Sequence, residues 1–337
     1  MSKGKVLITG VSGFIAGQVA KEALAQGYSV RGSVRNLNRA EEVRGVLAKS
    51  GADVSALEFC ALDLMKDEGW DEALQGVDFL CHCASPFIAE IPKDPDELIR
   101  PAVDGTRRAV GAALKAGVRK IALTSSFAAI GFGAPPKSSP YTGDDWTVSG
   151  GRGVTPYYES KLQAEKAAWD LVEAAGRRDA LTVINPVLVL GPSLHSDLST
   201  SVVLIKRMLK GEFPMAPDYS IPVVDVRDVA ALHVRALADD LGGERIIAGE
   251  ETMSMLQMAD ALRSVAPNAK LPKRLAPNFM LRLLALFDKS VASITDDLGN
   301  HRTVDRGPAE AALGRELIPA REAVVESAKA LKAQGVV

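Results

Sequence analysis

Short apolar runs that alternate with helical segments constrain the fold of this chain more than any other feature. The runs are rich in β-branched residues, and the segments between them carry apolar residues near helical spacing. The runs are KVLIT at Lys5, YSVRGSV at Tyr28, ALEFCAL at Ala56, VDFLCHC at Val77, RKIALTSS at Arg119 and LTVINPV at Leu181. The clearest helical segments are 13–26, 97–116 and 157–175. This rhythm predicts an α/β fold, with a doubly wound parallel sheet and helices on both faces.

The same pattern predicts a large and a small part. Residues 1–190 carry the alternation and are expected to form a Rossmann domain, to which about 221–240 return. After Gly191 the pattern becomes irregular and more helical, so 191–220 and 241–337 are predicted to form a smaller substrate-binding region. Segment 131–155 is rich in proline and glycine, which predicts a loop, and loops of this length are usually functional.

Charge and composition favour work on a small molecule. The 40 basic and 42 acidic residues are spread along the chain without a run suited to nucleic acid or membrane lipid. Three cysteines (Cys60, Cys81 and Cys83) are too few for a disulfide framework, which is typical of a reducing compartment. We therefore expect a cytoplasmic monomer or homodimer with a small-molecule substrate and neither a nucleic-acid nor a membrane partner.

Neither end of the sequence predicts membrane insertion or export. The first strand begins at Lys5, where a secretory signal would need an apolar run and a cleavage site. The most apolar late segment, 279–287, is interrupted by Arg282 and is far shorter than the roughly 20 residues that span a bilayer. We expect it to be a helix packed on the protein.

A glycine-rich turn after the first strand predicts a dinucleotide site. Gly10 and Gly13 stand in the pattern G-x-x-G-x-x-A, and Ser12, Phe14 and Ile15 complete the turn into the following helix. Glycine allows a tight turn and a close approach of backbone N–H groups to a pyrophosphate, whose charge the helix N-terminus favours. A plain strand-to-helix turn with coincidental glycines is the alternative.

The end of the second strand favours NADP over NAD. The acidic residue that would bind a ribose 2′-hydroxyl is missing there, and Arg35 and Arg39 stand in its place. Guanidinium groups bind a 2′-phosphate through forked, charge-assisted hydrogen bonds. Solvated surface arginines are the alternative. Asp63, after the third strand, is a candidate for the adenine amino group, although a helix N-cap is a comparable interpretation.

Tyr157 and Lys161 are candidates for proton transfer. Their i, i+4 spacing places both on one face of a helix, whereas Tyr158 has Leu162 at that spacing. Tyrosine is a poor acid or base at neutral pH, but a cation at ~4 Å stabilises the tyrosinate by roughly 4 kcal/mol at an effective dielectric of 20. The pair is therefore predicted to exchange a proton with a substrate oxygen.

Ser125 and Ser126 end the fifth strand and can supply a hydroxyl to hold a substrate carbonyl. A double serine at a strand end is more often a cap or turn. Here it precedes loop 131–155, and Tyr157 follows that loop, so both motifs flank one crevice at the carboxyl edge of the sheet.

Together these motifs resemble the extended short-chain dehydrogenase/reductase family, in its dihydroflavonol reductase-like and aldehyde (methylglyoxal) reductase-like branch. The resemblance covers nearly the whole chain, and the ordered set is much more specific than any one motif. The motifs are TGVSGFIA at 9–16, VR at 34–35, DL at 63–64, LTSS at 123–126, YYESKLQAE at 157–165, NPVLVLGP at 185–192 and VDVRDVA at 224–230.

The resemblance implies a role for each matching residue. Ser126 is implied as the catalytic serine, with Ser125 as the alternative. Lys161 is implied to hold the nicotinamide ribose in addition to its role in proton transfer. Further cofactor contacts are implied for Leu64, Ala84, Ser85, Pro186 and Leu188. Phe87 is implied to face the substrate. The adjacent Cys81, His82 and Cys83 do not predict a metal site, because alternate residues of a strand point to opposite faces.

The resemblance also argues against dehydration and against a dihydroflavonol substrate, because the residues typical of those enzymes are missing. Phe127 and Ala128 follow Ser126 where dehydratases carry an acid, and Gly131 stands where flavonoid reductases carry an amide. The N-W-Y-C-Y-G-K signature of cinnamoyl-CoA reductases is not reproduced before Lys161.

The expected reaction is reversible, NADPH-dependent reduction of a hydrophobic or aryl-substituted aldehyde or ketone, with Ser126, Tyr157, Phe87 and Phe132 at the substrate. Leu188, Met215 and segment 279–287 also suggest an apolar pocket, although core packing is the commoner role of such residues. A nucleotide-sugar epimerase and a non-enzymatic NADP-binding regulator are the alternatives.

Overall fold

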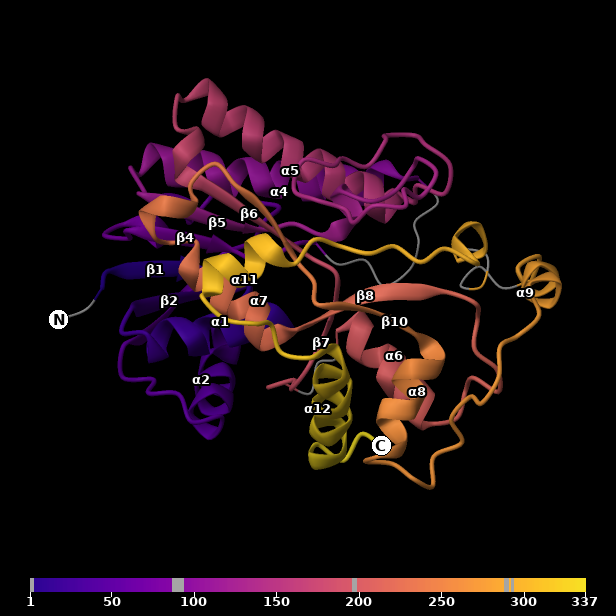
Figure 1. Cartoon of the computed structure of the whole chain (residues 1–337). Coiled ribbons are helices and arrows are strands. Elements are labelled where there is room, and N and C mark those ends of the chain that lie inside the picture. The colour runs from indigo at the N-terminus through magenta and orange to yellow at the C-terminus, as the bar shows by residue number, and fades with distance from the viewer. Residues whose placement is uncertain (1–2, 87–93, 196–198, 288–290, 292–293) are drawn as a thin grey trace.

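A seven-stranded sheet forms the centre of the molecule, and its neighbouring strands pair in parallel (Figure 1). The computed structural model describes residues 3–86, 94–195, 199–287, 291 and 294–337. The strand order is β3-β2-β1-β4-β5-β6-β9. The strands are β1 (Lys5–Ile8), β2 (Ser29–Val34), β3 (Leu57–Ala61), β4 (Phe79–His82), β5 (Lys120–Thr124), β6 (Leu181–Pro186) and β9 (Arg245–Ala248). Because strands are added outward from β1 in both directions, the sheet is doubly wound, as predicted.

Helices cover both faces of this sheet by packing on alternate residues of its strands. Val6 and Ile8 of β1 join one core, and Leu7 joins the other. The first core includes α1 (Phe14–Ala25), α2 (Ala40–Lys49), α7 (Val226–Arg235) and α11 (Gly307–Leu313). The second includes α3 (Trp70–Leu74), α4 (Asp96–Lys115) and α5 (Pro156–Ala174). A strand buried on both faces needs a continuous apolar sequence, which explains the run at Lys5.

A three-stranded sheet with helices of its own adjoins the large one. It contains β7 (Leu188–Leu190), β8 (Ser220–Asp225) and β10 (Glu251–Ser254), in the order β10-β8-β7. Its core is shared with α6 (Thr200–Leu209), α8 (Met255–Arg263) and α12 (Ala320–Ala333). Only Val187 separates β6 from β7, so the chain passes directly from one sheet to the other. The short 3-10 helices are η1 (Leu37–Arg39), η2 (Phe127–Ala129), η3 (Arg178–Ala180), η4 (Asp239–Leu241) and η5 (Thr295–Asp297).

The division into 1–190 with about 221–240, and 191–220 with 241–337, stays a prediction. Within it, the chain is more interleaved than the pattern suggests. β9 and α11 come from 241–337, yet β9 pairs with β6 and α11 packs against α7 and β9. β8 comes from 221–240 and pairs in the small sheet. Local periodicity predicts a strand but does not specify which sheet the strand joins.

Segment 279–287 departs in part from prediction, because it forms a helix but packs on the protein through few of its side chains. α9 (Asn278–Leu284) covers most of it, and Leu281 is the buried residue of that helix. Phe279 is 75% exposed and Phe287 is 86% exposed. High hydropathy predicted burial, but hydropathy does not determine whether a neighbouring surface is present to cover the segment. Among the described helices, none is both long and apolar enough to cross a membrane.

Candidate active site

The glycine turn lies at the point where the sheet reverses its winding. Gly10 follows β1 with φ +69°, a conformation that favours glycine. A Cβ at Gly10 would lie 3.0 Å from the Cβ of Ala84, which follows β4. The Gly10 N–H donates to the Ser33 hydroxyl at 3.0 Å. The turn is therefore held between β2 and β4, at the crevice where open α/β sheets bind ligands.

The first turn of α1 has the features of an anion site. Gly13 is its N-cap in an extended conformation, and the cap has no side chain to accept from the first N–H groups of the helix. The first turn, which includes Phe14 and Ile15, contains no acidic residue. Ser12 is half-buried beside the turn. Unsatisfied N–H groups and the helix dipole favour a phosphate at this position.

Thr9 stabilises the wall of this crevice by hydrogen bonds to the segment after β4, although the sequence did not predict it as a site residue. Its hydroxyl oxygen accepts from the backbone N–H groups of Cys83 and Ala84, each at 3.0 Å. The same oxygen lies 2.9 Å from Nδ1 of His82. Burial, with the Lys161 charge as a smaller cause, lowers the pKa of His82 to about 3. The predicted cofactor residue Ala84 is thus fixed to β1 through one buried hydroxyl.

Arg35 and Arg39 differ in their surroundings. Arg35 is exposed just after β2 and makes no hydrogen bond or ion pair with another described residue. The Arg39 guanidinium contacts the Glu42 carboxylate at 3.1 and 3.2 Å. Arg35 is therefore the more available of the two for a 2′-phosphate, whereas Arg39 would have to share its charge with Glu42.

Asp63 forms a local turn after β3. Its Oδ1 accepts from the Met65 N–H at 3.0 Å, which is an Asx turn and not a helix N-cap, because the next helix, α3, begins at Trp70 with Gly69 as its N-cap. Leu64 beside it is half-buried and contacts α4, where a Cβ at Gly105 would meet it at 3.2 Å. Contacts of Asp63 and Leu64 with adenine stay a prediction.

The predicted catalytic helix, α5, begins immediately before Tyr157. Thr155 is the N-cap and accepts from the Tyr158 N–H at 3.3 Å, and Pro156 occupies the first helical position. Tyr157 is 47% exposed, and the Lys161 Nζ lies 5.9 Å from the centroid of its ring. The Lys161 Nζ also donates to the Ser85 hydroxyl at 3.1 Å. The helix thereby brings Tyr157, Lys161 and the segment after β4 together.

The two serines after β5 have different environments. Ser125 is buried, and its hydroxyl donates to the Glu165 carboxylate. Ser126 is only half-buried, and its hydroxyl oxygen accepts from the Ala128 N–H at 3.1 Å, which leaves the proton available to another acceptor. Because η2 packs against α5, Ser126 lies next to the catalytic helix. The structure thus favours Ser126 over Ser125 as the hydroxyl that faces a substrate.

Aromatic packing forms the side of the site next to loop 131–155. The Phe132 ring stacks on the Tyr158 ring with centroids 4.0 Å apart. The Arg302 guanidinium lies 4.6 Å from the centroid of Phe132. Pro186 is buried at the end of β6, and Leu188 is half-buried at the start of β7. Phe87, the other predicted substrate residue, lies outside the described residues.

Met215 is half-buried and α9 is largely exposed, so a role of Met215 and segment 279–287 in an apolar substrate pocket stays a prediction. In the part of the chain that the structure describes, no cluster of potential metal ligands occurs.

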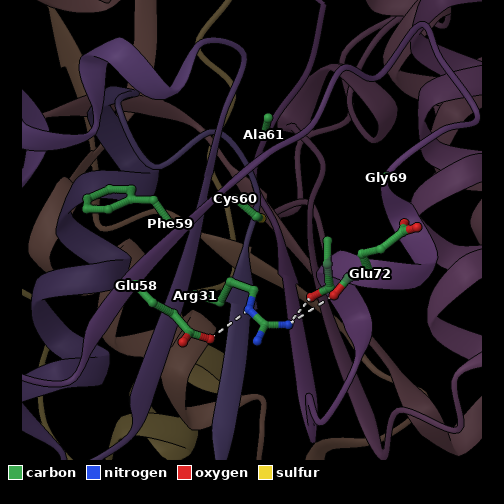
Figure 2. A pocket seen from close by; sticks show the side chains of 8 residues that line it. Arg31, Glu58, Phe59, Cys60, Ala61, Gly69 and Glu72 are labelled. Carbon is green, nitrogen blue, oxygen red and sulfur yellow. Dashed lines mark hydrogen bonds and ion pairs between the residues drawn. The ribbon is translucent and has the colours of Figure 1, made fainter.

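A surface hollow of about 400 Å³ lies elsewhere, between β2, β3 and α3 (Figure 2). Its most polar group, Arg31, is already engaged: Nε donates to Glu58 at 2.7 Å, and Nη1 donates to the carbonyl oxygens of Ala73 and Gln75 at 2.8 and 3.0 Å. Arg31 is therefore a structural connection between β2, β3 and α3. The hollow includes neither the glycine turn nor the catalytic helix.

A doubly wound sheet, a glycine turn at its switch point and a Tyr-Lys helix define a dinucleotide-dependent enzyme of the Rossmann class. The comparisons identify the family: residues 6–249 match the NAD dependent epimerase/dehydratase family, and the chain belongs to it. The resemblance to the extended short-chain dehydrogenases/reductases is thereby confirmed.

Within this family the chain is similar to reductases. It is 30% identical to cinnamoyl-CoA reductase 1 of Petunia hybrida over 335 residues, which cover 98% of this chain and 92% of the relative. It is also 30% identical to tetraketide alpha-pyrone reductase 1 of Arabidopsis thaliana, with 81% and 84% covered. The structure is similar to that of yeast methylglyoxal/isovaleraldehyde reductase Gre2 complexed with NADPH, with a TM-score of 0.79, 26% identity, and 99% and 100% covered.

Proposed function

We propose that this protein reduces a hydrophobic or aryl-substituted aldehyde or ketone to the alcohol, reversibly, with Ser126, Tyr157 and Lys161 as the catalytic residues. The arrangement around Lys161 carries this proposal. One ammonium group lies 5.9 Å from the Tyr157 ring centroid and 3.1 Å from the Ser85 hydroxyl, beside the cofactor crevice. The Lys161 ammonium and the half-exposed Tyr157 phenol lie together at one dinucleotide site. This arrangement supports proton transfer by the phenol, coupled to hydride transfer from the cofactor.

The chain is an oxidoreductase, and its cofactor is NADP. Its residues fit this cofactor, because Gly10 makes the tight turn with φ +69°, the α1 N-terminus has no side-chain cap, and the Arg35 side chain has no partner among the described residues. When bound, NADPH supplies a hydride for the carbonyl carbon. The first turn of α1 would hold the pyrophosphate, Arg35 the 2′-phosphate, and Ala84 and Ser85 the neighbouring part of the cofactor.

The side chains of the protein bind and protonate the oxygen of the carbonyl group. Ser126 donates a hydrogen bond that orients this oxygen, and Tyr157 transfers a proton to it as negative charge develops. The Lys161 ammonium, 5.9 Å from the centroid of the Tyr157 ring, attracts the negative charge that develops on this side chain. Alcohol oxidation uses the same groups in reverse.

An apolar, aromatic-lined site supports a hydrophobic substrate. Tyr158 follows Tyr157 in the chain, and its ring stacks on that of Phe132. Leu188 is half-buried at the start of β7. The names of two relatives, cinnamoyl-CoA reductase and methylglyoxal/isovaleraldehyde reductase, include an aryl-substituted and a branched-chain carbonyl compound. The free thiols of Cys60, Cys81 and Cys83 support a cytoplasmic location, and we propose that the enzyme is a monomer or homodimer.

Removal of the phenolic oxygen of Tyr157 tests the proposed proton transfer. Tyr157→Phe is expected to lower kcat for aryl aldehydes by about 10²-fold or more, because the proton donor is lost. NADPH oxidation is followed by absorbance on a panel of aryl aldehydes, α-diketones, β-ketoesters and flavanonols. Tyr158→Phe, the matched control on the next position, keeps the ring that stacks on Phe132 and is expected to keep activity.

Full activity of Tyr157→Phe would contradict the mechanism. Tightly bound dinucleotide with no NADPH consumption on the whole panel would instead support the epimerase alternative.

A further inference from the structure

Glu165 is a buried carboxylate on the catalytic helix that the proposed chemistry does not use. It follows Lys161 by one helical turn, so Tyr157, Lys161 and Glu165 lie at i, i+4 and i+8 on one side of α5. Its side chain is fully buried, with 0% exposure. An ionised side chain in such a position needs strong partners, because desolvation is costly.

Four hydrogen-bond donors converge on this carboxylate from four elements of the chain. Oε2 accepts from the Ser125 hydroxyl and from Nδ2 of Asn185 at 2.7 Å. Oε1 accepts from Nε of Arg245 at 2.5 Å and from Nε1 of Trp169 at 3.4 Å. The carboxylate therefore joins α5 to the ends of β5 and β6 and to β9.

Two of these donors, Ser125 and Asn185, fix the backbone of the proposed catalytic serine, Ser126. Ser125 precedes Ser126 in the chain, and Nδ2 of Asn185 also donates to the Ser126 carbonyl oxygen at 3.2 Å. The Asn185 Oδ1 is buried without a hydrogen-bond partner in the described part of the chain. The amide is thus oriented by its two acceptors, Glu165 and Ser126, since the reversed amide would bring its oxygen against both.

The third donor extends the network to loop 131–155. Arg245 donates through Nη1 to the carbonyl oxygens of Gly143 and, at 2.7 Å, of Asp145. Its guanidinium also lies 3.5 Å from the centroid of the Trp146 ring. The loop that connects the proposed catalytic serine to the proposed catalytic tyrosine is therefore anchored to the same carboxylate.

We propose that Glu165 is the positioning residue of the active site, which sets Ser126 and the loop against the helix that carries Tyr157 and Lys161. This inference rests on the proposed function, because it assumes that Ser126 and Tyr157 act on the same substrate oxygen. Glu165 itself touches neither, and it acts through Ser125, Asn185 and Arg245. Small displacements of a catalytic group reduce turnover much more than they reduce binding.

Glu165→Gln is the primary test, because the four partners are all donors. An amide offers one oxygen and one NH2 group. The NH2 group would face either Arg245 and Trp169, which can only donate, or Asn185 Nδ2 and the Ser125 hydroxyl, of which only the hydroxyl can accept. We expect kcat at saturating aldehyde and NADPH to fall at least about tenfold, with the aldehyde KM and the NADPH Kd changed less than about threefold. Glu173→Gln is the matched control, since Glu173 lies on the same helix and pairs with Arg178 at the surface.

Ser125→Ala is the second variant, which keeps the ion pair of Glu165 and Arg245 and so remains informative if Glu165→Gln does not fold. We expect a fall in kcat of at least about threefold with KM and NADPH Kd unchanged, because one side of Ser126 is released. Amide hydrogen exchange of the NADPH-bound protein gives a readout without turnover. Exchange in 125–132 is expected to be faster in both variants than in the wild type or Glu173→Gln, and exchange in 143–148 to be faster only in Glu165→Gln, which weakens the Arg245 anchor.

The outcomes separate this inference from the proposed function. If Tyr157→Phe abolishes activity while the folded Glu165 and Ser125 variants keep wild-type kcat and wild-type exchange, the positioning role is wrong and the mechanism stands. If exchange is faster as expected but Tyr157→Phe stays active, the proposed mechanism is wrong, whereas the structural link from Glu165 to Ser126 holds. A parallel rise in KM and NADPH Kd, with kcat unchanged, would also overturn the positioning role.

Discussion

A single hydroxyl, that of Thr9, determines the protonation of the histidine beside it. Its oxygen accepts from two backbone N–H groups, of Cys83 and Ala84, so its own proton must point to Nδ1 of His82. His82 is therefore neutral, with its proton on Nε2. This assignment agrees with the pKa of about 3 that burial, aided by Lys161, gives the imidazole.

Arg35 is expected to decide between NADPH and NADH. Arg35→Ala is predicted to lower the ratio of kcat/KM for NADPH to that for NADH by about ten- to a hundredfold, because a charge-assisted bond to the 2′-phosphate is lost. Steady-state kinetics with both cofactors provide the measurement. Arg39→Ala should have the smaller effect, because Arg39 already contacts Glu42.

An unchanged ratio in Arg35→Ala would contradict this account of cofactor choice. A larger change in Arg39→Ala would instead assign the phosphate to Arg39.

Site residues that form a pattern within a few positions could be predicted from the sequence. Residues whose partners are far away in the sequence could not. Gly10, Tyr157 and Lys161 follow from spacing within a few residues, and the N-cap before Tyr157 is visible as Thr-Pro. Glu165 is separated from Arg245 by 80 positions, and Thr9 from Ala84 by 75. Their pairing depends on strand order in the folded sheet, which no local pattern of residues contains.

At the scale of elements, the helix bounds agree with prediction, because capping is local. The helix predicted at 157–175 is α5 at Pro156–Ala174, and the one predicted at 97–116 is α4 at Asp96–Lys115. Segment 279–287 was predicted as a packed helix, and it forms a helix with Leu281 buried but most of its other apolar side chains exposed, because apolar content identifies a helix face but not a partner for that face.

Two glycines in different elements should respond oppositely to substitution by alanine. A Cβ at Gly143, in loop 131–155, would collide with the Arg245 carbonyl oxygen, so Gly143→Ala is expected to lower the free energy of unfolding by about 1–3 kcal/mol. Gly45 lies within α2, and a Cβ there meets no atom within 4 Å, so Gly45→Ala should raise it by about 0.5–1 kcal/mol. Urea unfolding measures both values.

A loss of activity in Gly143→Ala, but not in Gly45→Ala, is also expected, because the loop joins the two catalytic motifs. Equal unfolding free energies for the two variants would show that the loop adapts without cost.

At the scale of the whole molecule, two buried histidines are expected to make the fold sensitive to acid. Burial lowers the pKa of His82 to about 3 and that of His233 to about 4, against 6.5 for the free side chain. Below pH 6.5 the unfolded chain therefore binds protons that the folded chain does not, so stability falls as the pH falls. Each histidine contributes up to about 1.4 kcal/mol per pH unit between about pH 6.5 and its folded pKa.

His233→Gln isolates one of these contributions. Nδ1 of His233 lies 2.7 Å from the Val229 carbonyl oxygen, and its Nε2 lies 2.6 Å from the Thr124 hydroxyl, two contacts that a glutamine amide can reproduce. The free energy of unfolding of the variant, measured by urea titration from pH 7 to pH 4, should decrease less steeply than that of the wild type. Identical slopes would exclude His233 as a source of acid sensitivity.

The contact between Arg245 and loop 131–155 has a consequence for the divergence of such enzymes. Arg245 binds Gly143 and Asp145 through their carbonyl oxygens, which every amino acid possesses. The anchor therefore specifies the path of the loop but few of its side chains, with the packing of Trp146 and the lack of space for a Cβ at Gly143 as exceptions. If the loop contacts the substrate as proposed, its other positions are a natural starting point for directed evolution of substrate choice.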